Sequence, residues 1–208
     1  MFFGIDHLVF AGTRDDHRQL GEALLPRGFV AVPGRLRFDD IGAHSESYAY
    51  AGGGFVEVVY EVEPGRAPRV WFGGPLPRLM GIGVSSDDFA ADTAGWLWHM
   101  DEVQVLDDGS RHRIVAAGPH EHQSPLYLFA MDRPDRTLDH PGLGGTAVLH
   151  ALRFAGAEHA AWRERIERWL GRADAVGDVA LEFAPGDAGI AVTPVFDGPF
   201  ELSPRAGG

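Results

Sequence analysis

Two short apolar segments each carry one side chain that can bind a metal or transfer a proton. His7 lies within the run 4–12, and Glu57 lies within the run 54–61. Both runs have the β-branched and aromatic composition that is typical of strands. A polar side chain inside an apolar strand needs a hydrogen-bond partner or a ligand when it is buried. If the two strands pair, we expect His7 and Glu57 to meet inside a curved sheet.

The side chains of a strand alternate between its two faces, and this alternation predicts the neighbours of His7 and Glu57. Side chains of one parity share a face, so we expect His7 to share a face with Ile5 and Val9. By the same rule Glu57 shares a face with Phe55 and Val59. The imidazole and the carboxylate would then be polar groups on otherwise apolar surfaces.

His7 and Glu57 allow more than one chemistry. Imidazole and carboxylate are ligands for Zn, Fe, Mn, Ni or Co, so one interpretation is a divalent metal site. The other is a hydrogen-bonded pair, or a general acid–base pair that works without a metal. No organic cofactor is indicated by any motif in the chain.

A second polar cluster follows in the sequence. His44, Glu46 and Tyr48 share one parity of the strand candidate 43–50. If a hairpin forms through the three glycines at 52–54, this face would neighbour Glu57, where it could bind a polar substrate or supply a further ligand. The alternative is an exposed polar edge of the sheet.

Two further histidines are candidates for the same site. His150 lies on a later strand candidate and echoes His7, so it is a third candidate metal ligand; the alternative is a half-buried histidine at a domain contact. His140 lies on a loop rich in Pro and Gly that could fold over a cavity and touch the substrate, or simply anchor that loop.

The order of predicted elements repeats along the chain. The first unit has a strand at 4–11, a helix at 15–25 capped by Thr13 or Asp15, and strands at 29–32, 47–51 and 55–62. The second has a strand from residue 80 that runs into a capped helix start, then strands at 102–106, 111–116 and 125–131, with a turn at 107–109. The third has a strand at 146–154, a helix at 157–170, and strands at 179–183 and 190–195.

This order resembles the vicinal-oxygen-chelate superfamily, which includes glyoxalases, bleomycin-resistance proteins and dioxygenases, and within it the glyoxalase-like branch with its His-Pro loop, here at 139–146. The resemblance implies an α+β fold in which paired βαβββ modules form a curved mixed sheet around a cavity, with a partial C-terminal module. The implied organisation is module one at 1–63, a linker at 64–78, module two at 79–135, the loop and third β-α-β unit at 136–197, and a tail at 198–208.

The resemblance also implies two metal ligands per module. His7 and Glu57 match the positions of module one. In module two the matching positions hold Gly81 and Phe129, which cannot ligate a metal, and we expect Phe129 to form an apolar wall against the substrate. A metal would then have open positions, or would recruit other side chains.

Composition narrows the function further. The net charge is −12, and none of the 18 basic residues is a lysine, which argues against nucleic-acid binding and excludes a lysine Schiff base. The absence of cysteine removes disulfides and thiolate catalysis. No apolar run reaches the length of a membrane span, and a cytoplasmic protein is expected. Modules of this kind often pair between chains, so a homodimer is compatible with the sequence.

Two functions follow from this interpretation. In the first, the chain is an enzyme that acts on a small oxygenated organic molecule, with isomerase, lyase or dioxygenase chemistry. In the second, it is a binding or resistance protein that holds a drug or natural product without a metal, with His7 and Glu57 as polar anchors.

Overall fold

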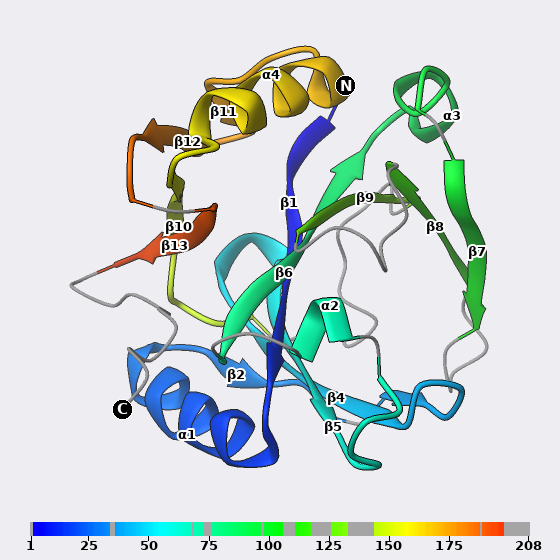
Figure 1. Cartoon of the computed structure of the whole chain (residues 1–208), viewed down its shortest axis with the longest axis vertical. Coiled ribbons are helices and arrows are strands. Elements are labelled where there is room, and N and C mark those ends of the chain that lie inside the picture. The colour runs from blue at the N-terminus through cyan, green and yellow to red at the C-terminus, as the bar shows by residue number, and fades with distance from the viewer. Residues whose placement is uncertain are drawn as a thin grey trace.

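The computed structural model describes residues 2–33, 36–67, 69–72, 76–96, 98–105, 111–117, 126–132, 144–187 and 189–197. Its strands form two sheets (Figure 1). In the large sheet the strand order is β2-β4-β5-β1-β6-β9-β8-β7, with β3 paired to β4. In the small sheet the order is β11-β12-β10-β13.

The first half of the large sheet is a βαβββ unit with one additional short strand. Its elements are β1 (Phe2–Gly12), α1 (Arg14–Leu24), the 3-10 helix η1 (Leu25–Arg27), β2 (Val30–Ala31), β3 (Leu36–Phe38), β4 (Ala43–Ala49), the 3-10 helix η2 (Ala51–Gly53) and β5 (Phe55–Glu61). Strand β5 lies parallel to β1, and β4 lies antiparallel to β5. The predicted element order and the hairpin at 52–54 are confirmed, whereas β3 was not predicted.

The second half repeats the pattern with a much smaller helix. Its elements are α2 (Arg69–Phe72), β6 (Arg78–Ser86), α3 (Phe89–Asp92), β7 (Trp98–Val105), β8 (Arg111–Ala117) and β9 (Tyr127–Met131). Strand β9 lies parallel to β6, and β8 lies antiparallel to both β9 and β7. The turn predicted at 107–109 lies outside the described residues.

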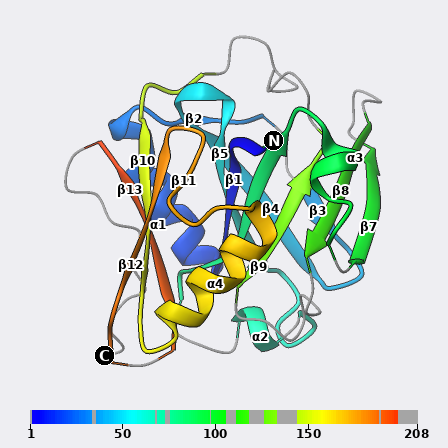
Figure 2. The same ribbon diagram turned by 90° about the horizontal axis from the view of Figure 1, so that it is seen from above.

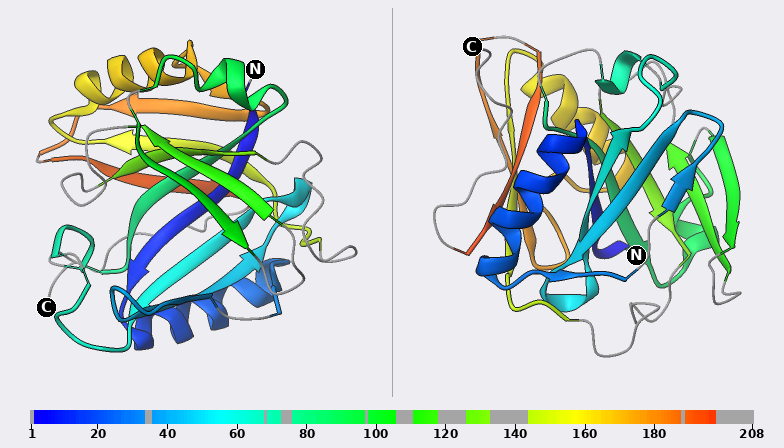
Figure 3. Two further views of the ribbon diagram at one scale, coloured as in Figure 1. Left: turned by 90° about the vertical axis from the view of Figure 1, so that its right-hand side faces the viewer. Right: turned by 90° about the horizontal axis from the view of Figure 1, so that it is seen from below.

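The two halves join through the antiparallel pair β1–β6. Figure 1 shows this pair in the middle of the sheet, with β4 and β5 on one side and β7 and β8 on the other. Further views show the sheet bending around one of its faces (Figure 3). We call this the inner face, and it carries an apolar cluster of Val9, Ala11, Ala43, Val59, Met80, Ile114, Phe129 and Met131.

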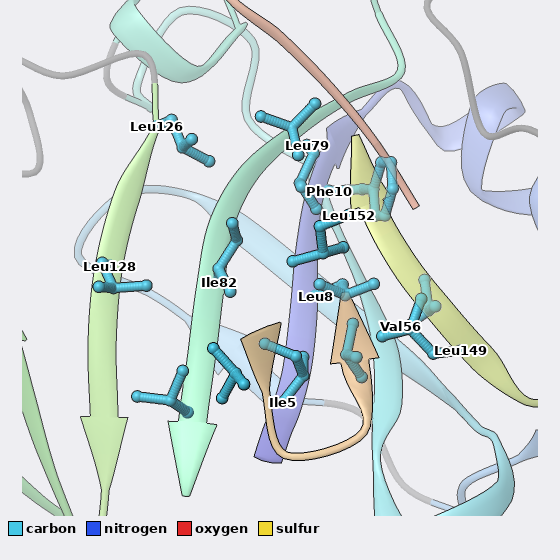
Figure 4. Packing of buried hydrophobic residues seen from close by; sticks show 14 of the residues in the cluster. Ile5, Leu8, Phe10, Val56, Leu79, Ile82, Leu126, Leu128, Leu149 and Leu152 are labelled. Atoms are coloured by element: carbon cyan, nitrogen blue, oxygen red, sulfur yellow. The ribbon is translucent and has the colours of Figure 1, made fainter. Parts of the chain in front are cut away.

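A third unit covers the opposite, outer face. It consists of β10 (Leu149–Ala155), α4 (His159–Leu170), β11 (Ala175–Val176), β12 (Val179–Ala184) and β13 (Ala191–Phe196). Seen from above, the small sheet stands beside β1 and β6 (Figure 2). Leu149 and Leu152 of β10 pack against Leu8, Phe10 and Ile82 in one apolar cluster (Figure 4).

Capping residues in the sequence set the ends of the helices on this outer face. Thr13 caps α1 in a reciprocal capping box: its Oγ1 accepts from the backbone N–H of Asp16, and an Asp16 carboxylate oxygen accepts from the backbone N–H of Thr13. Helix α4 ends at Gly171, whose φ of 74° is the left-handed conformation that glycine adopts at little cost. The α4 face carrying Trp162 and Ile166 is buried.

The fold class predicted from the sequence is therefore confirmed. Paired βαβββ modules form a curved mixed sheet, and a partial third module packs on its outer face. Within the ranges described above, no helix has both the length and the apolar character that a membrane span requires.

Candidate functional site

A β-bulge in β1 decides which way His7 points. The pairing with β6 shifts between Ile5, opposite Val84, and His7, opposite Gly83. A bulge places two residues against one and interrupts the alternation of faces. Ile5 consequently packs with Leu8 in the apolar cluster on the outer face, which we call the outer cluster. Val9 packs in the apolar cluster on the inner face, the inner cluster. The expectation that Ile5 shares a face with His7 is thus wrong, because strand alternation holds only where pairing is regular.

The residue that precedes His7 fixes its ring. Nδ1 of His7 lies 2.8 Å from Oδ1 of Asp6, and the Ser85 hydroxyl donates to Oδ2 of Asp6 at 2.7 Å. All three residues are buried, Asp6 with only 1% of its surface exposed. An ionised carboxylate can only accept, so Nδ1 of His7 donates to Asp6. In the neutral ring Nε2 then carries the lone pair that a general base or a metal ligand uses.

That nitrogen faces Glu57. Nε2 of His7 lies 3.7 Å from Oε2 of Glu57, with 7% and 8% of the two side chains exposed. This is beyond a direct hydrogen bond, yet close enough for both groups to contact one atom placed between them. The other oxygen, Oε1 of Glu57, is buried and has no hydrogen-bond partner. The proximity expected from the sequence is observed.

Aromatic rings enclose His7 on two sides. The Phe55 ring stacks on the imidazole with centroids 4.5 Å apart, and the Phe129 ring meets it edge-on at 4.7 Å. Gly83 makes this arrangement possible, since a Cβ at that position would lie 2.9 Å from the Phe129 ring and 3.1 Å from Nδ1 of His7. The imidazole is therefore held between two apolar walls.

The strand register identifies the matching positions of the second half. Glu57 is paired with Val9, two residues beyond His7. Phe129 is paired in the same way with Gly83, two residues beyond Gly81. Gly81 and Phe129 thus stand at positions equivalent to those of His7 and Glu57, and neither side chain carries a metal-binding atom.

The residues present do not fit a metal held entirely by protein ligands. Across the described ranges, no three side chains from His, Asp and Glu come together as a group that could hold a metal ion. His7 and Glu57 supply two donors, and the ring of Phe129, which has no metal-binding atom, lies against His7. A catalytic zinc ion usually has three protein ligands.

The predicted substrate cluster lies on the other face of the sheet. The β4–β5 pairing sets Ser47 opposite Glu57, and paired residues share a face. His44, Glu46 and Tyr48 therefore project from the outer face, and the expectation that they neighbour Glu57 is wrong. The sequence could not supply the register, and a shift of one residue exchanges the two faces.

On that outer face Glu46 and Tyr48 form a network with His17 of helix α1 and with Tyr60. Nε2 of His17 lies 3.0 Å from Oε2 of Glu46 and 3.1 Å from the Tyr48 hydroxyl, and the Tyr60 hydroxyl donates to Oε1 of Glu46 at 3.3 Å. Burial, reinforced by the charge of Glu46, raises the pKa of Tyr48. A cavity of about 480 Å³ beside it is also lined by Arg14 and Arg18. It lies across the sheet from His7 and Glu57.

The remaining predicted residues do not join the pair. His150 lies on the small sheet, is half exposed, and bonds through Nε2 to Asp197 at 2.5 Å. The structure therefore does not bring this candidate ligand to His7 and Glu57. His140 lies outside the described residues.

Sequence reasoning missed two polar residues of the inner face. Ser45, Val59, Ala11 and Arg78 form one row across β4, β5, β1 and β6. Oγ of Ser45, like Nε and Nη2 of Arg78, is buried without a hydrogen-bond partner. Burial lowers the pKa of Arg78. No local pattern marks either residue, because their shared row exists only once the strands are paired.

Comparison with known proteins gives the fold. No family model matches the chain, and no curated protein matches it. Among solved structures, a hypothetical protein from Staphylococcus aureus is 8% identical, with 90% of this chain and 88% of that chain covered and a TM-score of 0.62. A methylmalonyl-CoA epimerase solved with methylmalonyl-CoA is 17% identical over 64% of this chain and 95% of its own, at a TM-score of 0.47.

A hypothetical protein from Bacillus halodurans is 13% identical over 65% of this chain and 97% of its own, at a TM-score of 0.45. The likeness to the Staphylococcus aureus protein, whose TM-score is 0.62, concerns the fold alone. Fold does not define chemistry, so function must be argued from the inner face.

Proposed function

We propose that this chain is an enzyme that transfers a proton at a carbon atom next to a carbonyl group of a small oxygenated organic molecule. His7 acts as the base and Glu57 as the second proton-transferring group. The class of reaction is an isomerisation or an elimination. The inner face of the large sheet is the proposed site.

One observation carries this proposal: the buried chain of contacts from Ser85 through Asp6 and His7 to Glu57. A carboxylate that holds one ring nitrogen of histidine orients the ring and favours proton uptake at the other. A structural histidine would use both nitrogens in short hydrogen bonds, whereas Nε2 here faces a carboxylate 3.7 Å away.

The chemistry follows from the atoms available. Nε2 of His7 removes the proton from the carbon, and the electron pair of that C–H bond moves onto the carbonyl oxygen to form an enolate. Glu57, when protonated, returns a proton to the carbon for isomerisation or to a leaving group for elimination. The apolar walls of Phe55 and Phe129 exclude water and strengthen these interactions.

The resemblance also implies a divalent metal, for which His7 and Glu57 would be the protein ligands. Because two donors do not make up such a site, we assign no step to a metal. Titration with Zn²⁺, Mn²⁺, Ni²⁺ and Fe²⁺ tests this choice, with the His7→Ala, Glu57→Ala double variant as control. Metal that binds the wild type tightly and the double variant weakly would replace the metal-free scheme.

A second candidate is a binding protein that sequesters a small molecule without changing it. The observation that favours it is the apolar character of the inner face, with Phe129 at a position where the resemblance implies a ligand. In that case the same polar groups would only anchor the bound molecule.

Hydrogen–deuterium exchange separates the two candidates. Pyruvate, 2-oxobutyrate and acetoacetate are incubated with the protein in D₂O, and loss of the proton signals next to the carbonyl group is followed by NMR. We expect His7→Gln and Glu57→Gln to slow exchange by about 100-fold or more. His150→Gln is the matched control, because His150 is exposed on the other sheet.

If His7→Gln exchanges as fast as the wild type, the assignment of the base is wrong. If the wild type binds one of these acids without exchange, the binding-protein candidate is correct. Circular dichroism spectra of each variant verify that the fold is intact.

A further inference from the structure

Arg78 has a buried edge without a protein partner. Its Nε and Nη2 atoms are inaccessible to solvent and make no hydrogen bond. Arg78 as a whole is half-buried. Buried polar atoms in folded proteins are nearly always hydrogen-bonded, and a buried donor without a partner costs stability. These two unpaired donors indicate a ligand that would accept their hydrogen bonds.

The face on which Arg78 lies follows from its pairing. Arg78 is opposite Ala11 in the β1–β6 register, and Ala11 belongs to the inner cluster. The next residue, Leu79, packs in the outer cluster. The Arg78 side chain therefore projects from the same face as His7 and Glu57.

The unpaired atoms define the shape of the missing group. Nε and Nη2 lie on one edge of the guanidinium and direct two parallel N–H bonds the same way. This fork matches two oxygens of a carboxylate or of a phosphate. A neutral carbonyl would satisfy one of the two donors and leave the charge without a partner.

The same face holds unpaired acceptors at a distance from Arg78. Glu57 is on β5, two strands away from Arg78 on β6, and it lies two residues before Val59, which is in the same row as Arg78. Ordinary strand spacing then places the Cα atoms of Arg78 and Glu57 about 12 Å apart. Its Oε1 atom and the Ser45 hydroxyl are the other buried atoms without a partner in the described ranges. The polar atoms that a ligand would complete thus lie at separate points of one face.

We propose that Arg78 binds an oxyanion of the substrate through Nε and Nη2, so that the molecule acted on by His7 and Glu57 is an organic acid or a phosphate ester. The oxyanion lies over β6, and the remainder of the molecule extends across Val9 and Ala11 toward Glu57. This inference rests on the proposed function for the identity of the reacting end, whereas the oxyanion site stands on Arg78 alone.

Binding of simple probes tests the oxyanion site without any reaction. Succinate, succinamide and inorganic phosphate are titrated by NMR against the wild type and against Arg78→Gln. We expect succinate or phosphate to bind the wild type, with affinity reduced about 10- to 100-fold in Arg78→Gln. Succinamide, which lacks the charge, should not bind. The tighter of the two anions identifies the carboxylate or the phosphate class.

The matched control is Arg153→Gln, because Arg153 is an exposed arginine that pairs with Glu182 on the small sheet. It should bind the anion like the wild type. The melting temperature of ligand-free Arg78→Gln should equal or exceed that of the wild type, since buried N–H groups without partners are removed. Should it fall instead, Arg78→Lys keeps the charge but not the fork, and an affinity between those of wild type and Arg78→Gln would still support the site.

Equal anion binding by the wild type and Arg78→Gln, or no binding by the wild type, would overturn the inference. Loss of binding in Arg78→Gln without deuterium exchange in the wild type would leave the oxyanion site in place and refute the proton-transfer function. The two proposals can thus fail separately.

Discussion

The ring of Phe129 meets the ring of His7 edge-on, with centroids 4.7 Å apart. Phe129 holds in the second half of the large sheet the position that Glu57 holds in the first. An apolar ring therefore stands beside the catalytic candidate where the family resemblance would place a ligand. This relationship separates the present site from a four-ligand metal centre.

Replacing this ring should create metal affinity. In Phe129→His a third donor would stand next to His7 and Glu57, and we expect Zn²⁺ or Ni²⁺ to bind about tenfold more tightly than in the wild type or more. Without metal the variant should melt at a lower temperature, because a polar ring replaces a buried apolar one, and added metal should restore the loss. Calorimetric titration measures the affinity, with Phe129→Leu as the control that adds no donor. Unchanged metal affinity would show that Phe129 does not face the pair.

Asp6 is a positioning residue for His7. In Asp6→Asn an amide NH₂ replaces one carboxylate oxygen. When that group faces His7 in place of Oδ1, the favoured ring proton should move from Nδ1 to Nε2, while the amide oxygen still accepts from Ser85. Long-range ¹H–¹⁵N spectra of the imidazole report this tautomer directly, without any substrate. Deuterium exchange should fall about 100-fold or more. An unchanged tautomer, with exchange also unchanged, would mean that Asp6 has only a structural role.

Gly83 should tolerate no side chain. In Gly83→Ala the new methyl group would lie 2.9 Å from the Phe129 ring and 3.1 Å from Nδ1 of His7. Such overpacking costs about 1–3 kcal/mol of folding free energy, and it should also displace the imidazole. Urea unfolding measures the loss. Gly95→Ala is the matched control, since a Cβ at Gly95 meets no atom within 4 Å; equal stability of the two variants would contradict the tight contact.

Tyr48 should make stability depend on alkaline pH. Burial raises its pKa above the value of 10.0 that is usual for a tyrosine. The folded state then binds more protons than the unfolded state once the pH exceeds about 10, so stability falls as the pH rises through this window. In Tyr48→Phe part of this dependence should disappear. Thermal unfolding from pH 9 to pH 11 measures it, and identical slopes for the two proteins would refute the assignment.

Some of this protein could be predicted from its sequence because the signals are local. The alternating runs around His7 and Glu57, the capping residue Thr13 and the amphipathic segment 157–170 depend on neighbours within a few residues. These signals predicted the order of nearly all strands and the closeness of His7 to Glu57. The short strands β3 and β11 were not predicted.

The tertiary structure decided from which face of the sheet each side chain projects. A bulge separates Ile5 from His7, and the β4–β5 register turns Glu46 away from Glu57. Both depend on which residue of another strand lies opposite, and one residue of displacement exchanges the two faces of a sheet. Strand alternation alone cannot report either feature.

For the same reason, the unpaired buried edge of Arg78 can be recognised only in the tertiary structure. The sequence fixes the residue types, including a lone arginine at the start of a strand. Whether its guanidinium meets a partner depends on β1 and β6 pairing and on which faces the modules present to each other. The sequence by itself determined the secondary-structure elements and the functional groups of the side chains. Long-range strand pairing decided which of these groups contact one another and which have no partner within the protein.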